Sequence, residues 1–273
     1  MDDLQRGGLG ALTELWWRAV TDLADFLADL PEAAWDLPTD LPGWDVRAVA
    51  AHVAHLESVL AGGPHETAEV PDLPHVRGPM GQFTEIGVLT RSDRTGAEIV
   101  AEIRATTARR REALLATPPR DPDEPAPGVF GAIGWSTRTL FRNRPLDVWM
   151  HEQDVRRATG RPGNLDSPAG DHTTSYLMES LGFVLAKQVG ALPGTTAVLE
   201  VEGSAPVAAE VGDDGRGRLL DAPPAQPSVR IATDRESFLL RAGGRREVPS
   251  ERFEVGGDPD LGARVIASLA VTP

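Results

Sequence analysis

Hydrophobic residues in the first two-thirds of the chain recur at the three- and four-residue spacing of amphipathic helices. Asp45 precedes one of these periodic segments and is expected to cap it, whereas Pro145 is expected to interrupt another. Helices joined by short and medium connections are typical of a helical bundle. Five helices are expected, over residues 9–30, 46–60, 93–115, 135–159 and 169–189.

Two segments rich in proline separate the helical patterns. Residues 62–92 contain Pro64, Pro71, Pro74 and Pro79 among glycines and histidines, and residues 117–128 contain five prolines. Because proline lacks an amide hydrogen and its ring clashes with the preceding turn of a helix, both segments are predicted to be loops. Long loops of this kind often form lids or the walls of a binding site.

The pattern changes near Ala191, where apolar and polar residues begin to alternate with the period of β-strands. A hairpin turn is expected at residues 213–215, and Asp234 and Asp258 are expected to cap two short helices. Strands are expected over residues 197–201, 205–211, 219–220, 228–231 and 253–255.

This change of pattern predicts two domains. Residues 1–191 would form the helical bundle, and residues 192–273 would form a small α+β domain. A chain of 273 residues is long enough for one medium and one small domain.

Composition and charge exclude several classes of function. A net charge of −14 at pH 7 argues against a nucleic-acid or anionic-membrane partner, because neutralising phosphates requires a basic surface. The chain has no run of about 18 apolar residues, as a membrane span requires, and residues 1–10 are acidic and polar, unlike a secretory signal. We therefore expect a cytoplasmic protein, with a monomer as the default state.

The chain contains no cysteine. This excludes disulfides, thiolate zinc sites and a nucleophilic thiol supplied by the protein. A metal site would therefore have to use His together with Asp or Glu, and any thiol chemistry would require an external thiol.

Two of the six histidines lie on the predicted helix 46–60. At about 100° per residue, His52 falls on the shoulder of the apolar stripe, from where its side chain can reach into the bundle. His55 points away from the stripe and is expected to face solvent. His52 is therefore the better candidate for a metal ligand, and a half-buried structural histidine is the alternative interpretation.

A second candidate pair lies on the predicted helix 135–159. Asp147 and His151 are four residues apart and so share one helix face, which Val155 and Ala158 continue. A carboxylate and an imidazole on an inward face are costly unless they are paired or bind a metal. The alternative is that Asp147 complements the helix dipole and accepts a hydrogen bond from His151. With His52, the pair makes the two-histidine, one-carboxylate set of many catalytic zinc sites, which leave a fourth position open.

Two motifs add a resemblance to a known family. Leu41-Pro42-Gly43-Trp44, with His52 eight residues after the tryptophan, resembles the first signature of the mycothiol-dependent maleylpyruvate isomerase family. The block over residues 146–163, which contains Asp147 and His151, is similar to its second signature. Residues 253–259 resemble the end of the small domain of the family.

The resemblance implies a DinB-like helical bundle followed by an α+β domain similar to sterol carrier proteins. It implies a divalent metal, usually zinc, bound by His52, Asp147 and His151, with Asp147 standing where the family has glutamate. It also implies a catalytic arginine from the small domain. Arg241 is the best match and Arg245 the rival, and a solvated helix end is the alternative for both.

The function implied by the resemblance is that of a metal-dependent enzyme with mycothiol as its thiol cofactor or co-substrate. The thiol would attack an electrophilic small molecule, in S-transfer or in cis–trans isomerisation. Two other functions stay open: a DinB-like metal-dependent hydrolase, and a metal-free protein that binds a lipid or another apolar small molecule.

Overall fold

The computed structural model describes residues 8–272 and divides the chain into two compact units. The first unit ends at Gly170 and the second begins at Asp171. Residues 1–7, on which part of the expectation about the N-terminus rests, and residue 273 lie outside the described residues. The predicted architecture, a helical bundle followed by a small α+β unit, is confirmed.

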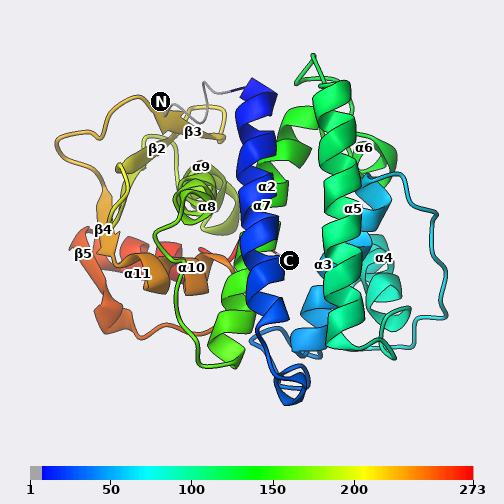
Figure 1. Ribbon diagram of the computed structural model, residues 1–273. Helices are drawn as coiled ribbons and strands as arrows, with labels where there is room; N and C mark the ends of the chain where they lie inside the picture. The colour runs from blue at the N-terminus through cyan, green and yellow to red at the C-terminus, as the bar shows by residue number, and fades with distance from the viewer. Residues whose placement is uncertain (1–7, 273) are drawn as a thin grey trace. The chain divides into compact units, whose positions relative to one another are not determined.

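Four long helices form the core of the first unit: α2 (Gly8–Ala28), α3 (Val46–Leu60), α5 (Gly96–Ala116) and α7 (Thr137–Ala158). The helices α2 and α3 each pack against both α5 and α7, so the four form one bundle around a common core (Figure 1). No helix among the described residues combines the length and apolar character that a membrane span needs. The short elements η1 (Glu32–Ala34) and α6 (Gly128–Ala132) lie in the connections.

Local sequence signals account for where the long helices begin. The Asp45 side chain accepts a hydrogen bond from the Ala48 amide, so the predicted cap of α3 is confirmed. Thr95 and Glu98 form a capping box at the start of α5.

The helix α7 continues through Pro145, so the predicted interruption is absent. Proline removes one backbone hydrogen bond, and burial of the residues on both sides of it keeps the helix continuous.

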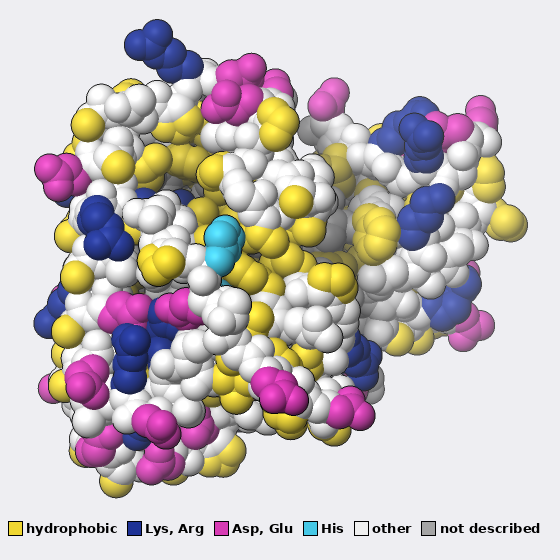
Figure 2. Space-filling view, turned by 90° about the vertical axis from the view of Figure 1, so that its right-hand side faces the viewer, with side chains coloured by type: hydrophobic (Ala, Val, Ile, Leu, Met, Phe, Trp, Pro, Cys, Tyr) yellow, Lys and Arg dark blue, Asp and Glu magenta, His cyan; other side chains and the backbone are white. Residues whose placement is uncertain are grey.

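The segment predicted to be a loop contains a further helix, α4 (Gly78–Leu89), which packs against α3. As a result His55 is buried, with its ring centroid 4.9 Å from that of Phe83, and the prediction that it faces solvent is wrong. The period within α3 identifies its face toward the other long helices, but it carries no information about a helix that covers the opposite side. Figure 2 views this side and shows hydrophobic side chains, scattered charges and a histidine at the surface.

The second unit includes residues that we expected in the bundle. The predicted helix 169–189 is divided into α8 (Pro168–Met178), α9 (Leu181–Phe183) and a π-helical turn, η2 (Val184–Gln188). Gly182 in α9 lies so close to Gly217 in β3 (Gly217–Leu220) that a Cβ atom on Gly217 would overlap the Gly182 carbonyl group. Because α9 and η2 pack on β2 (Val207–Val211) and β3, they belong with the sheet, and the units divide before the predicted boundary at 191 and 192.

All of the named strands in the described residues belong to one sheet, in the order β3-β2-β1-β4-β5. The strands β1 and β4 are parallel, and the other neighbours are antiparallel. The predicted caps of α10 and α11, Asp234 and Asp258, are confirmed. The remaining bounds are β1 (Thr196–Val201), β4 (Val229–Thr233), α10 (Arg235–Ala242), η3 (Ser250–Arg252), β5 (Phe253–Gly257) and α11 (Pro259–Ala267).

The contact between α4 and His55 predicts opposite effects for two glycines of the same helix. A Cβ atom on Gly87 would overlap the His55 imidazole, whereas one on Gly81 would meet Val76 at 3.5 Å, an ordinary contact distance. We expect Gly87→Ala to lower the free energy of unfolding by about 1–3 kcal/mol through overpacking. Gly81→Ala should leave it unchanged or raise it by up to about 1 kcal/mol, because alanine favours helix. Urea unfolding measures both, and equal effects would contradict the packing of α4 on His55.

Candidate metal centre

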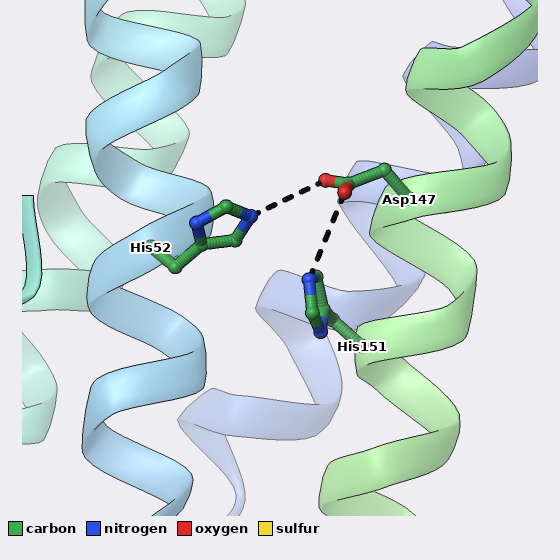
Figure 3. A group of neighbouring side chains, drawn as sticks. All are labelled: His52, Asp147 and His151. Atoms are coloured by element: carbon green, nitrogen blue, oxygen red, sulfur yellow. Dashed lines mark ion pairs between the residues drawn. The ribbon is translucent and has the colours of Figure 1, made fainter. Parts of the chain in front are cut away.

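Three potential metal ligands from two helices meet inside the bundle. His52 lies on α3, and Asp147 and His151 lie one turn apart on α7 (Figure 3). The Nε2 atom of His52 is 3.7 Å from Oδ2 of Asp147, and the Nε2 atom of His151 is 3.7 Å from Oδ1 of the same carboxylate. One donor atom from each residue lies within 4.8 Å of the other two. The structure thus brings together the three side chains that we singled out.

The donor set has the chemistry of a site for a divalent ion. In a tetrahedral zinc site with bonds of about 2.0–2.2 Å, neighbouring ligand atoms are roughly 3.4 Å apart. The 3.7 Å separations are close to this spacing, but they join the two histidines to different oxygens of Asp147. With one donor atom from each residue the group spans up to 4.8 Å, so the side chains would have to move together to coordinate an ion. Burial lowers the pKa of His52 to about 4, so its imidazole is neutral at pH 7, the form that binds a metal.

The carboxylate of Asp147 is held from behind by Arg144, which lies one turn earlier on α7. The Arg144 Nη1 atom donates a hydrogen bond of 2.9 Å to Oδ2 of Asp147, and its Nη2 atom donates one of 2.8 Å to Oε1 of Glu57. Burial alone would raise the pKa of Asp147, but the Arg144 guanidinium, followed by the two histidines, holds it well below its usual range. Asp147 is therefore anionic, as a metal ligand must be.

Glu57, the other partner of Arg144, is fully buried at the centre of the bundle. Its Oε2 atom accepts a hydrogen bond of 2.7 Å from Arg110 on α5, and its Oε1 atom accepts one of 2.9 Å from the Trp16 indole on α2. Burial would raise the pKa of Glu57, but Arg110 and Arg144 lower it below its usual value. This single carboxylate on α3 therefore has a partner on each of the three other long helices.

His151 has a buried carboxylate as its other neighbour. Its Nδ1 atom is 3.2 Å from Oδ2 of Asp154, and Oδ1 of Asp154 accepts a hydrogen bond of 2.9 Å from Arg157. A carboxylate placed in this way fixes the orientation of an imidazole ligand.

Trp44, from the first sequence motif, lies against both histidines. Its ring centroid is 5.0 Å from that of His52 and 6.2 Å from that of His151. The indole Nε1 atom donates to Oε2 of Glu85 on α4 at 3.0 Å, and Nε2 of His75 is 3.3 Å from the same oxygen. Trp44 thus forms an apolar wall beside the two histidines, and Glu85, from the segment between α3 and α5, fixes its indole.

Arg241 is bound within the second unit. It lies in the last turn of α10, and its Nε and Nη2 atoms donate to the carbonyl oxygens of Ile266 and Ala267 at 2.8 and 2.6 Å. Its Nη1 atom donates to both carboxylate oxygens of Glu247 at 3.0 Å. Arg241 therefore satisfies carbonyl groups at the end of α11. The catalytic role of Arg241, with Arg245 as its rival, stays a prediction.

Three residues around the site were not singled out from the sequence: Glu57, Arg144 and Asp154. Arg144 and Asp154 are three residues from a candidate ligand on the same helix, a spacing that places side chains on one face. Glu57 is an acidic residue in an otherwise largely apolar helix segment. The spacing on α7 and the isolated acidic residue on α3 are both visible in the sequence. Choosing these residues among the other charged ones requires knowledge of which helices pack together.

Comparisons with known proteins identify a family for both compact units. The family model described as the mycothiol maleylpyruvate isomerase N-terminal domain matches residues 16–156, and the MDMPI C-terminal domain matches residues 171–264. A crystal structure of the mycothiol-dependent maleylpyruvate isomerase is similar, with a TM-score of 0.57 and 18% identity. A structure of a histidine-to-alanine mutant of such an isomerase has the same TM-score and 17% identity.

Both of these alignments cover 91% of this chain and 92% of the other. At this level of identity the structural likeness establishes the fold. The interval between the two family models contains the division between the compact units at Gly170. No curated protein matches the sequence significantly.

The position of Glu57 predicts a large effect on stability. Glu57→Gln removes the charge that balances two buried arginines, so we expect the free energy of unfolding to fall by about 3–5 kcal/mol. Glu14→Gln is the matched control, because Glu14 pairs with Arg111 at the surface, where ion pairs contribute at most about 1 kcal/mol. Urea unfolding of the metal-free proteins measures both effects. If Glu57→Gln lowered the free energy of unfolding no more than Glu14→Gln does, the charge of Glu57 would not be needed for stability.

Proposed function

The chain belongs to the mycothiol-dependent maleylpyruvate isomerase family, and on that premise we propose that it is a metal-dependent enzyme that uses mycothiol as thiol cofactor or co-substrate. Its substrate would be an electrophilic small molecule, which undergoes S-transfer or cis–trans isomerisation. The observation that carries this proposal is the convergence of His52, Asp147 and His151 inside the bundle.

The three residues would bind the ion as two neutral imidazoles and one carboxylate. Three protein ligands are the usual number in catalytic zinc sites, which keep a further position for water or substrate. A divalent ion such as Zn²⁺ would keep a coordinated thiol deprotonated near neutral pH. Arg144 holds Asp147 in its anionic form, and burial keeps His52 neutral, so both ligands are ready to bind without losing a proton.

The protein does not supply a sulfur nucleophile, since it lacks cysteine. An external thiol such as mycothiol would provide it. In isomerisation, the sulfur would add to a carbon of the double bond, the electron pair of that bond would move to an adjacent electron-withdrawing group, and the substrate would rotate about the resulting single bond. Return of the electron pair would then expel the thiol. In S-transfer, the new carbon–sulfur bond would remain in the product.

The ligand assignment predicts the metal content of three variants. His52→Ala and His151→Ala should each lose bound divalent metal, most of it Zn²⁺, because two remaining ligands bind such an ion weakly. His55→Gln should retain metal, because His55 lies outside the group of three. Elemental analysis of the purified proteins after dialysis provides the measurement. Wild-type metal content in both alanine variants, or an equal loss in His55→Gln, would refute the assignment.

The thiol assignment predicts a spectroscopic change. Two imidazoles and one carboxylate leave the bound ion with net positive charge, which favours an anionic fourth ligand. Mycothiol added to the cobalt-substituted protein should therefore produce a sulfur-to-metal charge-transfer band. The S-methylated thiol is the control and should produce none. If mycothiol left the spectrum of the cobalt protein unchanged while the protein catalysed a water-dependent hydrolysis, the result would instead support a metal-dependent hydrolase.

A further inference from the structure

Five ionisable side chains follow one another along one side of α7: Arg144, Asp147, His151, Asp154 and Arg157. Their spacing of three or four residues places neighbouring members within reach of each other on the helix surface. The contacts between them run in sequence, from Arg144 to Asp147 at 2.9 Å, from Asp147 to His151 at 3.7 Å, from His151 to Asp154 at 3.2 Å and from Asp154 to Arg157 at 2.9 Å. Each of the two candidate ligands on α7 therefore has a charged neighbour one turn away.

The carboxylate of Asp154 is fixed by both of its oxygens. Oδ1 accepts a hydrogen bond from Nη2 of Arg157, and Oδ2 faces Nδ1 of His151. Arg157 in turn has its Nε atom 3.3 Å from Oδ2 of Asp40, in the segment before α3. Asp154 is fully buried, so its orientation cannot change without the loss of one of these contacts.

This contact decides which nitrogen of His151 carries the proton. An ionised carboxylate can only accept hydrogen bonds, so Nδ1 of His151 must donate to it. Nε2 lies 3.7 Å from Oδ1 of Asp147, too far for a hydrogen bond, so in a neutral imidazole it keeps its lone pair. His52 has no such carboxylate partner: its buried Nδ1 atom makes no hydrogen bond among the described residues. Packing against Trp44 orients that ring.

We propose that Asp154 is a positioning residue, which fixes the tautomer and orientation of His151 so that Nε2 is presented to the metal. The proposal rests on the metal site of the proposed function. A carboxylate in this position also makes an imidazole ligand more basic, and the loss of such partners typically weakens metal binding about 10–100-fold. Asp154 would thus act through His151, without being a ligand itself.

The first test compares the metal affinity of three variants, by competition with a chromophoric chelator. Asp154→Asn should weaken Zn²⁺ binding about 10–100-fold, whereas Asp154→Glu, which retains a carboxylate, should bind more tightly than Asp154→Asn. Asp40→Asn is the matched control, because it removes a partner of Arg157 without touching His151. It should bind Zn²⁺ as wild type does. Wild-type affinity in Asp154→Asn, or equal losses in Asp154→Asn and Asp40→Asn, would overturn the proposal.

The second test needs no metal. Long-range ¹H–¹⁵N spectra of the metal-free protein distinguish the protonated from the unprotonated nitrogen of a neutral imidazole, and His151→Ala identifies the signals of His151. We expect the proton on Nδ1 in wild type and a shift toward Nε2 in Asp154→Asn. A proton on Nε2 of His151 in the wild-type protein would refute the role of Asp154. Because this measurement uses the wild-type protein, it tests the proposal even if Asp154→Asn does not fold. A wild-type protein without metal affinity would contradict the proposed function alone.

Discussion

The arrangement of the first unit depends on the contacts of one buried carboxylate, that of Glu57. Removing an ion from water costs several kcal/mol, and this cost is offset only when the geometry of its partners is good. Trp16, Arg110 and Arg144 provide those partners, one from each of the other long helices. A shift of any helix along its axis would leave a buried charge without its partner. The register of the four helices is therefore specified by charge as well as by apolar packing.

The same cluster sets the electrostatics of the candidate metal centre. Glu57 and Asp147 carry two negative charges, and Arg110 and Arg144 carry two positive charges, so the four together are neutral. A divalent ion bound there by two imidazoles would add positive charge that these four groups do not compensate. Such a site favours an anionic additional ligand. The charge balance of the core thus supports a thiolate rather than a neutral molecule as the fourth ligand in the proposed function.

Features determined by neighbours in the sequence could be predicted, and those determined by distant packing could not. The bounds and cap of α3 follow from its apolar period and from Asp45. Helix phase and spacing made His52, Asp147 and His151 candidates, and the two family motifs gave that choice its weight. The burial of His55 depends on α4, which lies within a segment rich in proline. The place of α9 in the second unit depends on a close approach of two glycine backbones, Gly182 and Gly217. Neither contact leaves a periodic signal in the sequence.

The aspartate at position 147, where the family resemblance implies glutamate, is consistent with the local geometry. Its short side chain keeps the carboxylate near the surface of α7, within reach of Arg144 one turn before and His151 one turn after. The two oxygens then have different neighbours: Oδ2 lies near Arg144 and His52, and Oδ1 faces His151. Because Arg144 already donates to Oδ2, Oδ1 has the less encumbered lone pairs. The arginine would therefore favour coordination through one oxygen of Asp147, and a longer side chain would have to fold back to make the same contacts.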